Sequence, residues 1–282
     1  MPLADLPGST TGPDAAVVRV LSYNIRSMRD DREALARVIR ACAPDVVCVQ
    51  EAPRFFRWRK AAAWLARETG LVYTTGGATA AGPMILTSLR AHVERAEDTL
   101  LPRVPGLHRR GFATAVLRFG GGHRDTGHRE TGHRDTGHPE NGHRENGEGN
   151  GVRLGVVSCH LSLAAAERYE QAGMLLDHLA ALDVPYAIAA GDINDRPDGR
   201  AFRRIAGKLR DGWATEPWGS EATFSPKDPH QRIDGVFASE GIEIIGCGVP
   251  AGLPGVTDAD LRAATDHLPV LAALRLPRVS SV

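Results

Sequence analysis

The chain has 282 residues, enough for one large domain or two small ones with a substantial buried core. Its 34 lysine and arginine residues balance 34 aspartate and glutamate residues, so no overall basic charge indicates nucleic acid or an anionic membrane as a partner. The four cysteines lie in apolar runs and form no CxxC pair, and we interpret them as small buried side chains. They are Cys42, Cys48, Cys159 and Cys247.

The first 16 residues are polar and contain proline and glycine, and we predict a disordered tail over residues 1–16. This segment has neither the basic start nor the apolar core of a signal peptide. No apolar run reaches the ~20 residues needed to cross a bilayer. We therefore expect a cytoplasmic protein that is not an integral membrane protein, ending in a short tail over residues 277–282.

The first elements alternate between strand and helix. A buried strand is predicted over residues 16–24, a helix with one apolar face over 31–42, and a second buried strand over 45–51. Residues 54–70 are predicted to be helical, with Gly70 as the C-cap. Arginines alternate with aromatic residues at the start of this segment. We interpret them as side chains extending from an apolar helix face, and contact with a nucleic-acid strand is the alternative.

Strands then dominate before a helix appears again. The predicted strands are 71–75, 83–88, 92–101, 111–119, 152–161, 186–192, 231–239, 242–249 and 268–276, with a helix over 164–182. This order indicates a single α/β (α+β) domain with two sheets, and no segment has the composition of a domain linker.

Residues 122–146 contain a histidine every five residues, separated by glycine and charged residues. The histidines are His123, His128, His133, His138 and His143. Because such a repeat cannot bury apolar area to offset the entropy of ordering, we predict that residues 120–151 are a disordered insertion. Its flanking strands read as a hairpin. Loose binding of a transition metal by the five histidines is the alternative.

Isolated polar residues stand at the ends of several apolar strands, where α/β sheets assemble their sites. They are Asn24, Glu51, His160, Asp192, Asn194, Asp234, Asp266 and His267. Each one alone is explained most simply as a cap, a turn residue or a satisfied strand residue. Their types complement one another, and this joint occurrence indicates a site.

The carboxylates and amides of this set are hard oxygen ligands, of the kind that Mg²⁺ or Mn²⁺ prefers. A metal ion held there would bind a phosphate oxygen and neutralise developing charge. His160 and His267 can transfer protons near neutral pH, and Asp234 could orient one of them. This combination predicts a phosphoester hydrolase.

The order Asn, Gln-Glu, Ser-x-His-Leu, Gly-Asp-x-Asn, Arg-Ile-Asp and Asp-His-x-Pro resembles the endonuclease/exonuclease/phosphatase superfamily. The resemblance covers residues 17–276 apart from the repeat. It implies a deoxyribonuclease-like four-layer architecture, a two-sheet β-sandwich flanked by helices, with the catalytic site at the strand ends.

The resemblance also implies roles for individual residues. Glu51 matches the principal metal ligand of the family and Asn24 its neighbour at the metal, and we add Asp266 to this predicted ligand set. Asp192 and Asn194 match the pair that positions the attacking water and the phosphate.

The two histidines also have counterparts in the family. His267 matches the histidine that pairs with an aspartate, here Asp234. His160 matches a second histidine of the deoxyribonuclease-like and sphingomyelinase-like branches. Thr265 stands where the family usually has serine, and the tryptophan-cysteine-aspartate-arginine motif of the inositol phosphatases is absent.

We therefore predict a phosphodiesterase that uses Mg²⁺ or Mn²⁺ and nuclease-like attack by water. A phosphomonoesterase, a sphingomyelinase-like hydrolase of phospholipid headgroups and a catalytically dead binding scaffold are the alternatives. The expected partner is a phosphoester substrate, whether nucleic acid, lipid headgroup or small molecule, without a stable protein partner. The sequence leaves the choice among these substrates open.

Overall fold

A computed structural model describes residues 6–120 and 151–278 of the chain. The strands are β1 (Thr10–Thr11), β2 (Ala15–Asn24), β3 (Val46–Gln50), β4 (Val72–Gly76), β5 (Met84–Thr87), β6 (Ala91–Leu100), β7 (Gly111–Phe119), β8 (Val152–His160), β9 (Tyr186–Asp192), β10 (Arg210–Asp211), β11 (Asp234–Ala238), β12 (Glu243–Gly248) and β13 (Val270–Pro277). The α-helices are α1 (Arg32–Cys42), α2 (Trp58–Thr69), α3 (Ala165–Ala180), α4 (Arg200–Ala206), α5 (Gly212–Thr215) and α6 (Asp258–Ala264).

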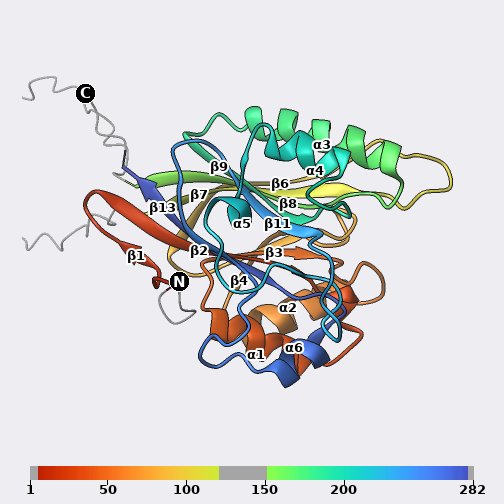
Figure 1. Cartoon of the computed structure of the whole chain (residues 1–282), viewed down its shortest axis with the longest axis horizontal. Coiled ribbons are helices and arrows are strands. Elements are labelled where there is room, and N and C mark those ends of the chain that lie inside the picture. The colour runs from red at the N-terminus through yellow and green to blue at the C-terminus, as the bar shows by residue number, and fades with distance from the viewer. Residues whose placement is uncertain (1–5, 121–150, 279–282) are drawn as a thin grey trace, which may run out of the picture.

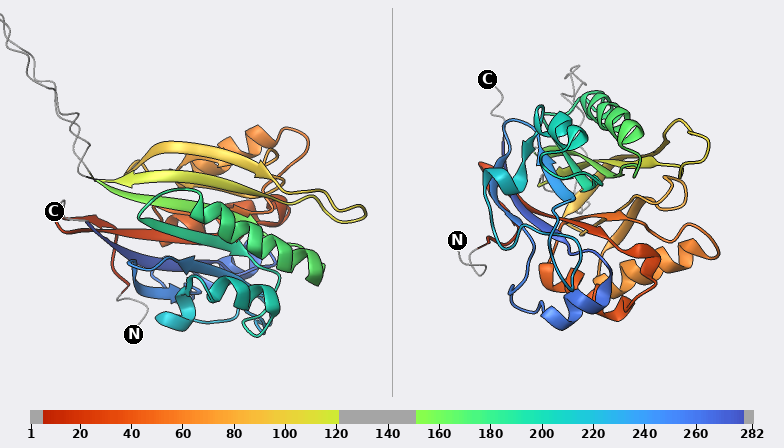
Figure 2. Two further views of the ribbon diagram at one scale, coloured as in Figure 1. Left: turned by 90° about the horizontal axis from the view of Figure 1, so that it is seen from above. Right: turned by 45° about the vertical axis from the view of Figure 1, so that its right-hand side comes forward.

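The strands form two mixed sheets that pack face to face (Figure 1). The first sheet has the order β12-β13-β2-β3-β5-β4, with β1 paired to β2, and the second has the order β10-β11-β9-β8-β7-β6. Helices α1, α2 and α6 lie on the outer side of the first sheet, and α3 and α4 lie on the outer side of the second (Figures 1 and 2). The predicted four-layer sandwich is confirmed.

Three clusters of buried apolar side chains lie between the four layers of helices and sheets and hold them together. Val20 and Ile188 belong to the layer between the sheets, Leu35 belongs to the layer under α1, and Leu175 belongs to the layer under α3. Because the central strands are covered on both faces, they are continuous apolar runs rather than alternating ones. The four cysteines are buried in these layers without disulfides, as the sequence indicated.

Two parallel strand pairs define the functional edge of the sandwich. β2 and β3 run parallel and are joined through α1, and β8 and β9 run parallel and are joined through α3. Since the carboxyl ends of parallel strands meet at one edge, Asn24 lies level with Gln50 in the first sheet, and His160 lies level with Asp192 in the second. The sequence signal for these units is the helical period between two apolar runs.

The structure corrects two predicted boundaries. The expected tail over residues 1–16 is packed from Leu6 onward: Leu6 is 4% exposed, Thr10–Thr11 pairs with β2, and the Arg19 guanidinium donates to the Leu6 carbonyl. The helix predicted over residues 54–70 begins at Trp58, so its first four residues are not helical, while the rest of the helix and its Gly70 C-cap are as expected. Such contacts cannot be predicted from a short polar segment itself, because the residues that it contacts are distant in sequence.

The strands that flank the histidine repeat pair as expected. β7 and β8 form an antiparallel ladder that reaches the Phe119–Val152 pair. The repeat itself, residues 122–146, lies outside the described residues. Within the parts of the chain that the structure describes, no helix is long and apolar enough to span a membrane.

Candidate active site

Asp192 stands at the centre of the site because β9 is the middle strand of three. In the register, Asp192 is level with His160 of β8 and with Asp234 of β11. Gly191 makes this approach possible, since a Cβ there would lie 2.0 Å from the Cys159 carbonyl oxygen. The Gly-Asp order is therefore a packing requirement as well as a chemical one.

Four groups surround the Asp192 carboxylate. Its Oδ2 accepts a hydrogen bond from Nδ2 of Asn24 at 3.0 Å, and its Oδ1 accepts one from the backbone N–H of Asn194 at 2.9 Å. Nε2 of His160 lies 3.4 Å and Nε2 of His267 lies 3.8 Å from the same Oδ2. Because Asn24 belongs to the other sheet, these contacts fix the carboxylate across the junction of the two sheets.

His267 is held in one orientation by Asp234. Its Nδ1 lies 2.9 Å from Oδ2 of Asp234, and the Phe224 ring packs 5.1 Å from the imidazole. Burial alone would lower the pKa of His267, but the charge and hydrogen bond of Asp234, together with the charges of Asp192 and Asp266, raise it to about 10. His267 is therefore a cation at neutral pH.

His160 has the opposite protonation state. It is 5% exposed, and burial lowers its pKa to about 3 although the charge of Asp192 opposes this shift. Its contact with Asp192 therefore joins a neutral imidazole to a carboxylate and is not an ion pair. The site thus contains one charged and one neutral histidine against the same oxygen atom.

These groups open into a cavity of about 630 Å³ at the strand ends. Among its lining residues are Glu51, Asn194, His160, Asp192 and His267. Glu51 directly follows β3 with a positive φ of 51°, and Asn194 follows β9 with a φ of 54°. Backbone strain of this kind in residues other than glycine is characteristic of functional sites.

The cavity is also lined by residues that sequence reasoning missed, among them the cations Arg29, Arg54 and Arg110, and by His108. Arg110 is 8% exposed, its Nε has no hydrogen-bond partner, and burial lowers its pKa while the charges of Asp192 and Glu51 oppose that shift. A signal for Arg110 existed. It stands at the start of β7, which is antiparallel to β8 and so begins at the same edge where β8 ends.

The donor set suits a hard divalent cation. Glu51 and Asp192 bring carboxylates to the same cavity, and Oδ1 of Asp234 is buried without a hydrogen-bond partner. Asp192, Asp234 and His267 each offer an atom within 4.8 Å of the others. Because Nδ1 of His267 already binds Asp234, we interpret this last trio as a proton-handling chain and the oxygen atoms as the metal-binding part.

Asp266 does not join the other predicted ligands. It is not among the residues that line the cavity, and its Oδ2 lies 3.3 Å from Nε of Arg26 in a half-exposed ion pair. The prediction that Asp266 is a metal ligand is therefore not supported by its position. Its neighbour Thr265 uses its hydroxyl to donate to the Asn24 carbonyl at 3.1 Å, so the serine-to-threonine departure keeps a structural hydrogen bond.

Thr223 is a further residue that sequence reasoning missed. Its Oγ1 accepts hydrogen bonds from the backbone N–H groups of Ile233 at 3.2 Å and Asp234 at 3.3 Å, and its carbonyl accepts one from Leu268 at 2.7 Å. It thereby connects the start of β11 to the start of β13, and so holds Asp234 beside His267.

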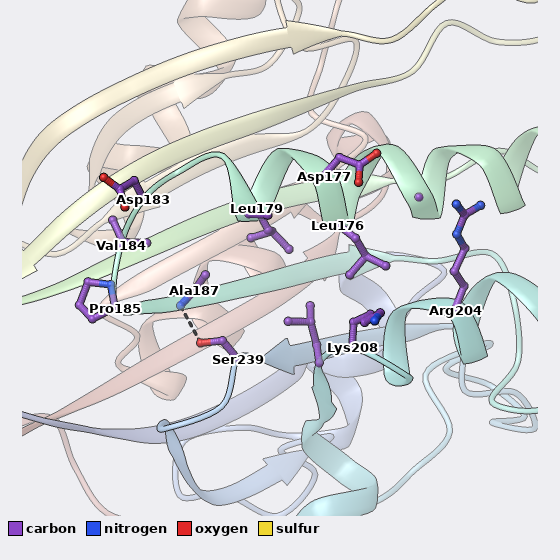
Figure 3. Close-up of a pocket in the computed structure, with 13 residues that line it drawn as sticks. Leu176, Asp177, Leu179, Asp183, Val184, Pro185, Ala187, Arg204, Lys208 and Ser239 are labelled. Carbon is purple, nitrogen blue, oxygen red and sulfur yellow. Dashed lines mark hydrogen bonds between the residues drawn. The ribbon is translucent and has the colours of Figure 1, made fainter.

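A second cavity, of about 650 Å³, lies between α3, α4 and the start of β9. Leu176, Leu179, Val184 and Pro185 contribute apolar surface, with Arg204 and Lys208 at one side (Figure 3). It is lined by none of the strand-end residues, and it flanks the end of β9 opposite Asp192, where Ser239 Oγ accepts from the Ala187 N–H at 2.9 Å. The chemistry therefore belongs to the cavity around Asp192.

The sequence profile of the Endonuclease/Exonuclease/phosphatase family matches residues 21–267, which include every strand-end residue described above. The chain belongs to this family. Its members are phosphoester hydrolases, so the predicted enzyme class is confirmed. No protein among the curated sequences matches this chain.

Solved structures share the fold at low sequence identity. An endonuclease/exonuclease/phosphatase from Bacteroides vulgatus has a TM-score of 0.64 and 17% identity over 92% of this chain and 99% of that chain. A mannosyl-6-phosphatase from Bacteroides thetaiotaomicron has a TM-score of 0.66 and 16% identity over 91% and 99%. Truncated TDP2 from Caenorhabditis elegans has a TM-score of 0.60 and 16% identity over 92% and 97%.

Proposed function

We propose that this phosphoester hydrolase is a metal-dependent phosphodiesterase in which a water molecule attacks phosphorus. One observation carries the proposal. Asp234, the charged His267 and Asp192 form a continuous chain of contacts at 2.9 and 3.8 Å, and its end faces a cavity that also contains Glu51. A proton donor and a proton acceptor are thus adjacent at one cavity wall.

The residues divide the reaction between them. Asp192 orients the attacking water and accepts its proton, while the water oxygen forms a bond to phosphorus. The bond to the leaving oxygen breaks, and that oxygen takes the proton from Nε2 of His267. Nε2 of His267 lies 3.8 Å from Oδ2 of Asp192. A small movement therefore lets Asp192 pass the proton taken from water to this Nε2, which restores both groups. His160 and Asn24 keep the carboxylate in place.

A divalent cation, Mg²⁺ or Mn²⁺, would be held at the oxygen-rich side of the cavity by the Glu51 carboxylate. Asn24 is not among the residues that line this cavity, and its amide is bonded to Asp192 and to the Arg26 N–H, so it would orient Asp192 beside the ion. Such an ion supplies charge neutralisation at a phosphoryl oxygen. Arg110, buried at the same cavity, binds another phosphoryl oxygen, because a guanidinium forms charge-assisted hydrogen bonds to phosphate. The four buried free cysteines are consistent with a reducing compartment such as the cytoplasm.

A phosphomonoester is the second candidate substrate, since one structural neighbour is a mannosyl-6-phosphatase. Purified protein should be assayed with chromogenic mono- and diesters, plasmid, single-stranded DNA, RNA and sphingomyelin, each with Mg²⁺ or Mn²⁺. Turnover of diesters at least about tenfold above that of monoesters is expected. The reverse ratio would replace the diesterase assignment with a phosphatase.

Glu51→Gln tests the metal site. The substitution exchanges a charged oxygen ligand for a neutral one of the same shape, so the Mg²⁺ concentration for half-maximal turnover should rise by about tenfold or more. Glu221→Gln, on the half-exposed carboxylate that pairs with Arg232, is the matched control and should leave that midpoint in place. An unchanged midpoint in Glu51→Gln would remove Glu51 from the ligand set.

A further inference from the structure

Two phenylalanines stand exposed beside the mouth of the cavity. Phe55 is 80% and Phe56 is 86% exposed, although large apolar side chains in this protein are otherwise mostly buried. They lie in the turn between β3 and α2, next to Arg54, which lines the cavity. The prediction of a helix from residue 54 is therefore wrong for these two residues, because α2 begins only at Trp58.

The opposite side of the mouth has the same character. The loop between β6 and β7 projects from the body of the molecule (Figures 1 and 2) and contributes His108 and Arg110 to the cavity. Its Val104 is 39% and its Leu107 is 38% exposed. Leu163, which lines the cavity after β8, is 71% exposed. Phe55, Phe56 and Leu163 thus lie at or next to residues that line the opening, and Val104 and Leu107 lie on the adjoining loop, where they line a neighbouring groove against α3.

Charge follows the same pattern. Residues 53–60 (PRFFRWRK) and 101–109 (LPRVPGLHR) contain arginine and lysine but no aspartate or glutamate, in a chain whose charges balance overall. We call these two segments, with Leu163, the basic apolar rim. The cations are Arg54, Arg57, Arg59, Lys60, Arg103 and Arg109. All of them except Arg54 are exposed.

We propose that the basic apolar rim docks the protein onto an anionic lipid surface, with the cavity mouth facing the headgroups. Exposed apolar side chains enter the interface between headgroups and acyl chains, and arginine and lysine contact lipid phosphates and carboxylates. The guanidinium of Arg57 lies 4.9 Å from the Phe56 ring centroid, so one local unit presents both components. The proposal concerns where the protein binds and does not depend on which phosphoester it cleaves.

A single-stranded nucleic acid is the other partner that arginines and aromatic rings suit. It needs flat rings on which bases stack. The second side of the rim presents valine and leucine instead, which offer no such platform. Insertion into a lipid surface uses aliphatic and aromatic side chains alike, and therefore accounts for both sides of the mouth.

The test is flotation of the full chain with phosphatidylcholine vesicles, with and without phosphatidylserine, at low and high salt. Binding is expected only to vesicles with phosphatidylserine, and salt should weaken it. Phe55→Ser with Phe56→Ser should lower this affinity by about tenfold or more. The matched control is Leu89→Ser, a residue that is 88% exposed in the β5–β6 turn at the other end of the sandwich, and it should bind like the wild type.

A second pair of variants isolates the charge. Arg59→Glu with Lys60→Glu should lower vesicle affinity by at least about tenfold, because each cation near an anionic surface contributes several-fold. These residues begin α2, where acidic side chains suit the helix dipole, so folding is preserved. Arg203→Glu with Lys208→Glu, exposed and around the end of α4, is the control and should have little effect.

Three results would overturn the proposal. The first is absence of wild-type binding to phosphatidylserine vesicles. The second is an equal loss of affinity in rim and control variants whose melting temperatures are unchanged. The third is that the protein binds an oligothymidylate but no vesicles and that the phenylalanine substitutions abolish this binding, which would assign the rim to nucleic acid. Asp192→Asn should bind vesicles like the wild type, so failure of the proposed catalytic role would not alter this outcome.

Discussion

Two histidines that approach the same carboxylate oxygen are held in opposite protonation states. His160 faces Asp192 alone from within a buried strand, so desolvation dominates and its pKa falls to about 3. His267 also donates a hydrogen bond to the charged carboxylate of Asp234, and its pKa rises to about 10. The residue type is the same at both positions, and the number of carboxylate neighbours decides the chemistry.

This difference predicts which substitutions stop turnover. Asp192→Asn and His267→Ala should each lower kcat by roughly 10²–10⁴-fold, the contribution of a general acid or base. His178→Ala is the matched control. That half-buried histidine contacts the Thr114 hydroxyl at 2.8 Å, far along α3 from the cavity, and its removal should leave kcat unchanged. Near-normal turnover in Asp192→Asn, with unchanged melting, would contradict the mechanism.

The position of Arg110 predicts that its substitution weakens substrate binding more than it slows the chemical step. Its buried Nε has no partner, and an unpaired buried cation is costly unless an anion meets it. Arg110→Gln should raise KM by about tenfold to a hundredfold, the value of one or two charge-assisted hydrogen bonds, with a smaller change in kcat. Arg109→Gln removes the exposed neighbouring charge and should not change KM for a soluble substrate. Equal losses in both variants would show a general electrostatic effect.

The sequence could predict the strand-end residues but not every role. Asn24, His160 and Asp192 each follow a long apolar run, so their position was readable from pattern alone. Asp266 instead precedes an apolar run, and its side chain turns to Arg26, because side-chain direction at a turn depends on distant partners. Phe55 and Phe56 were misplaced for a related reason, since apolar character alone does not tell whether a turn precedes a helix.

At the scale of elements, length decided what could be predicted. The period of α1 and α3 is clear over 11 and 16 residues. The helices α4 and α6 have only seven residues each, too short for a helical period to be distinguished from a loop. The two-residue strand β1 depends on its pairing with β2, and Leu6 is held by the Arg19 guanidinium and by the apolar layer under α1, so both depend on partners distant in sequence.

The β7–β8 hairpin carries a prediction about the histidine repeat. Deleting Gly122–Asn146 should leave turnover and melting temperature nearly unchanged, because the segment has no apolar residue and the ladder closes at the Phe119–Val152 pair. Loop length changes closure entropy by only ~0.6 kcal/mol per halving. Turnover should be measured against metal concentration at pH 6 and pH 8. A tenfold shift of either curve upon deletion would assign the repeat a role in metal or substrate recruitment.

Across the whole molecule, the catalytic residues lie at one end of the sandwich, and a buried hydrogen-bond network around Asp45 that holds strands together lies at the other. Of the nine residues other than glycine that have a positive φ in the described part of the chain, four line the cavity: Ser27, Glu51, Ala81 and Asn194. The far end contains Asp45, which is 2% exposed and accepts hydrogen bonds from the Arg19 N–H at 3.0 Å, the Ser88 hydroxyl at 3.1 Å and the Arg90 guanidinium at 2.8 Å. Asp45 thereby joins β2 and the loop after β5 to the start of β3.

This separation predicts that stability can be lost without loss of chemistry. Asp45→Ala leaves three donors without their acceptor, and because Arg90 can still reach water, the cost should be about 2–3 kcal/mol. For a chain of this size the melting temperature should fall by about 5–10 °C, while kcat at a temperature where the variant is folded stays at the wild-type value. Glu243→Ala removes an exposed ion pair with Arg275 and should shift melting by less than about 2 °C. A matching loss of kcat in Asp45→Ala would show that the two ends are coupled through β2 and β3, and that the site is not independent of its distant anchor.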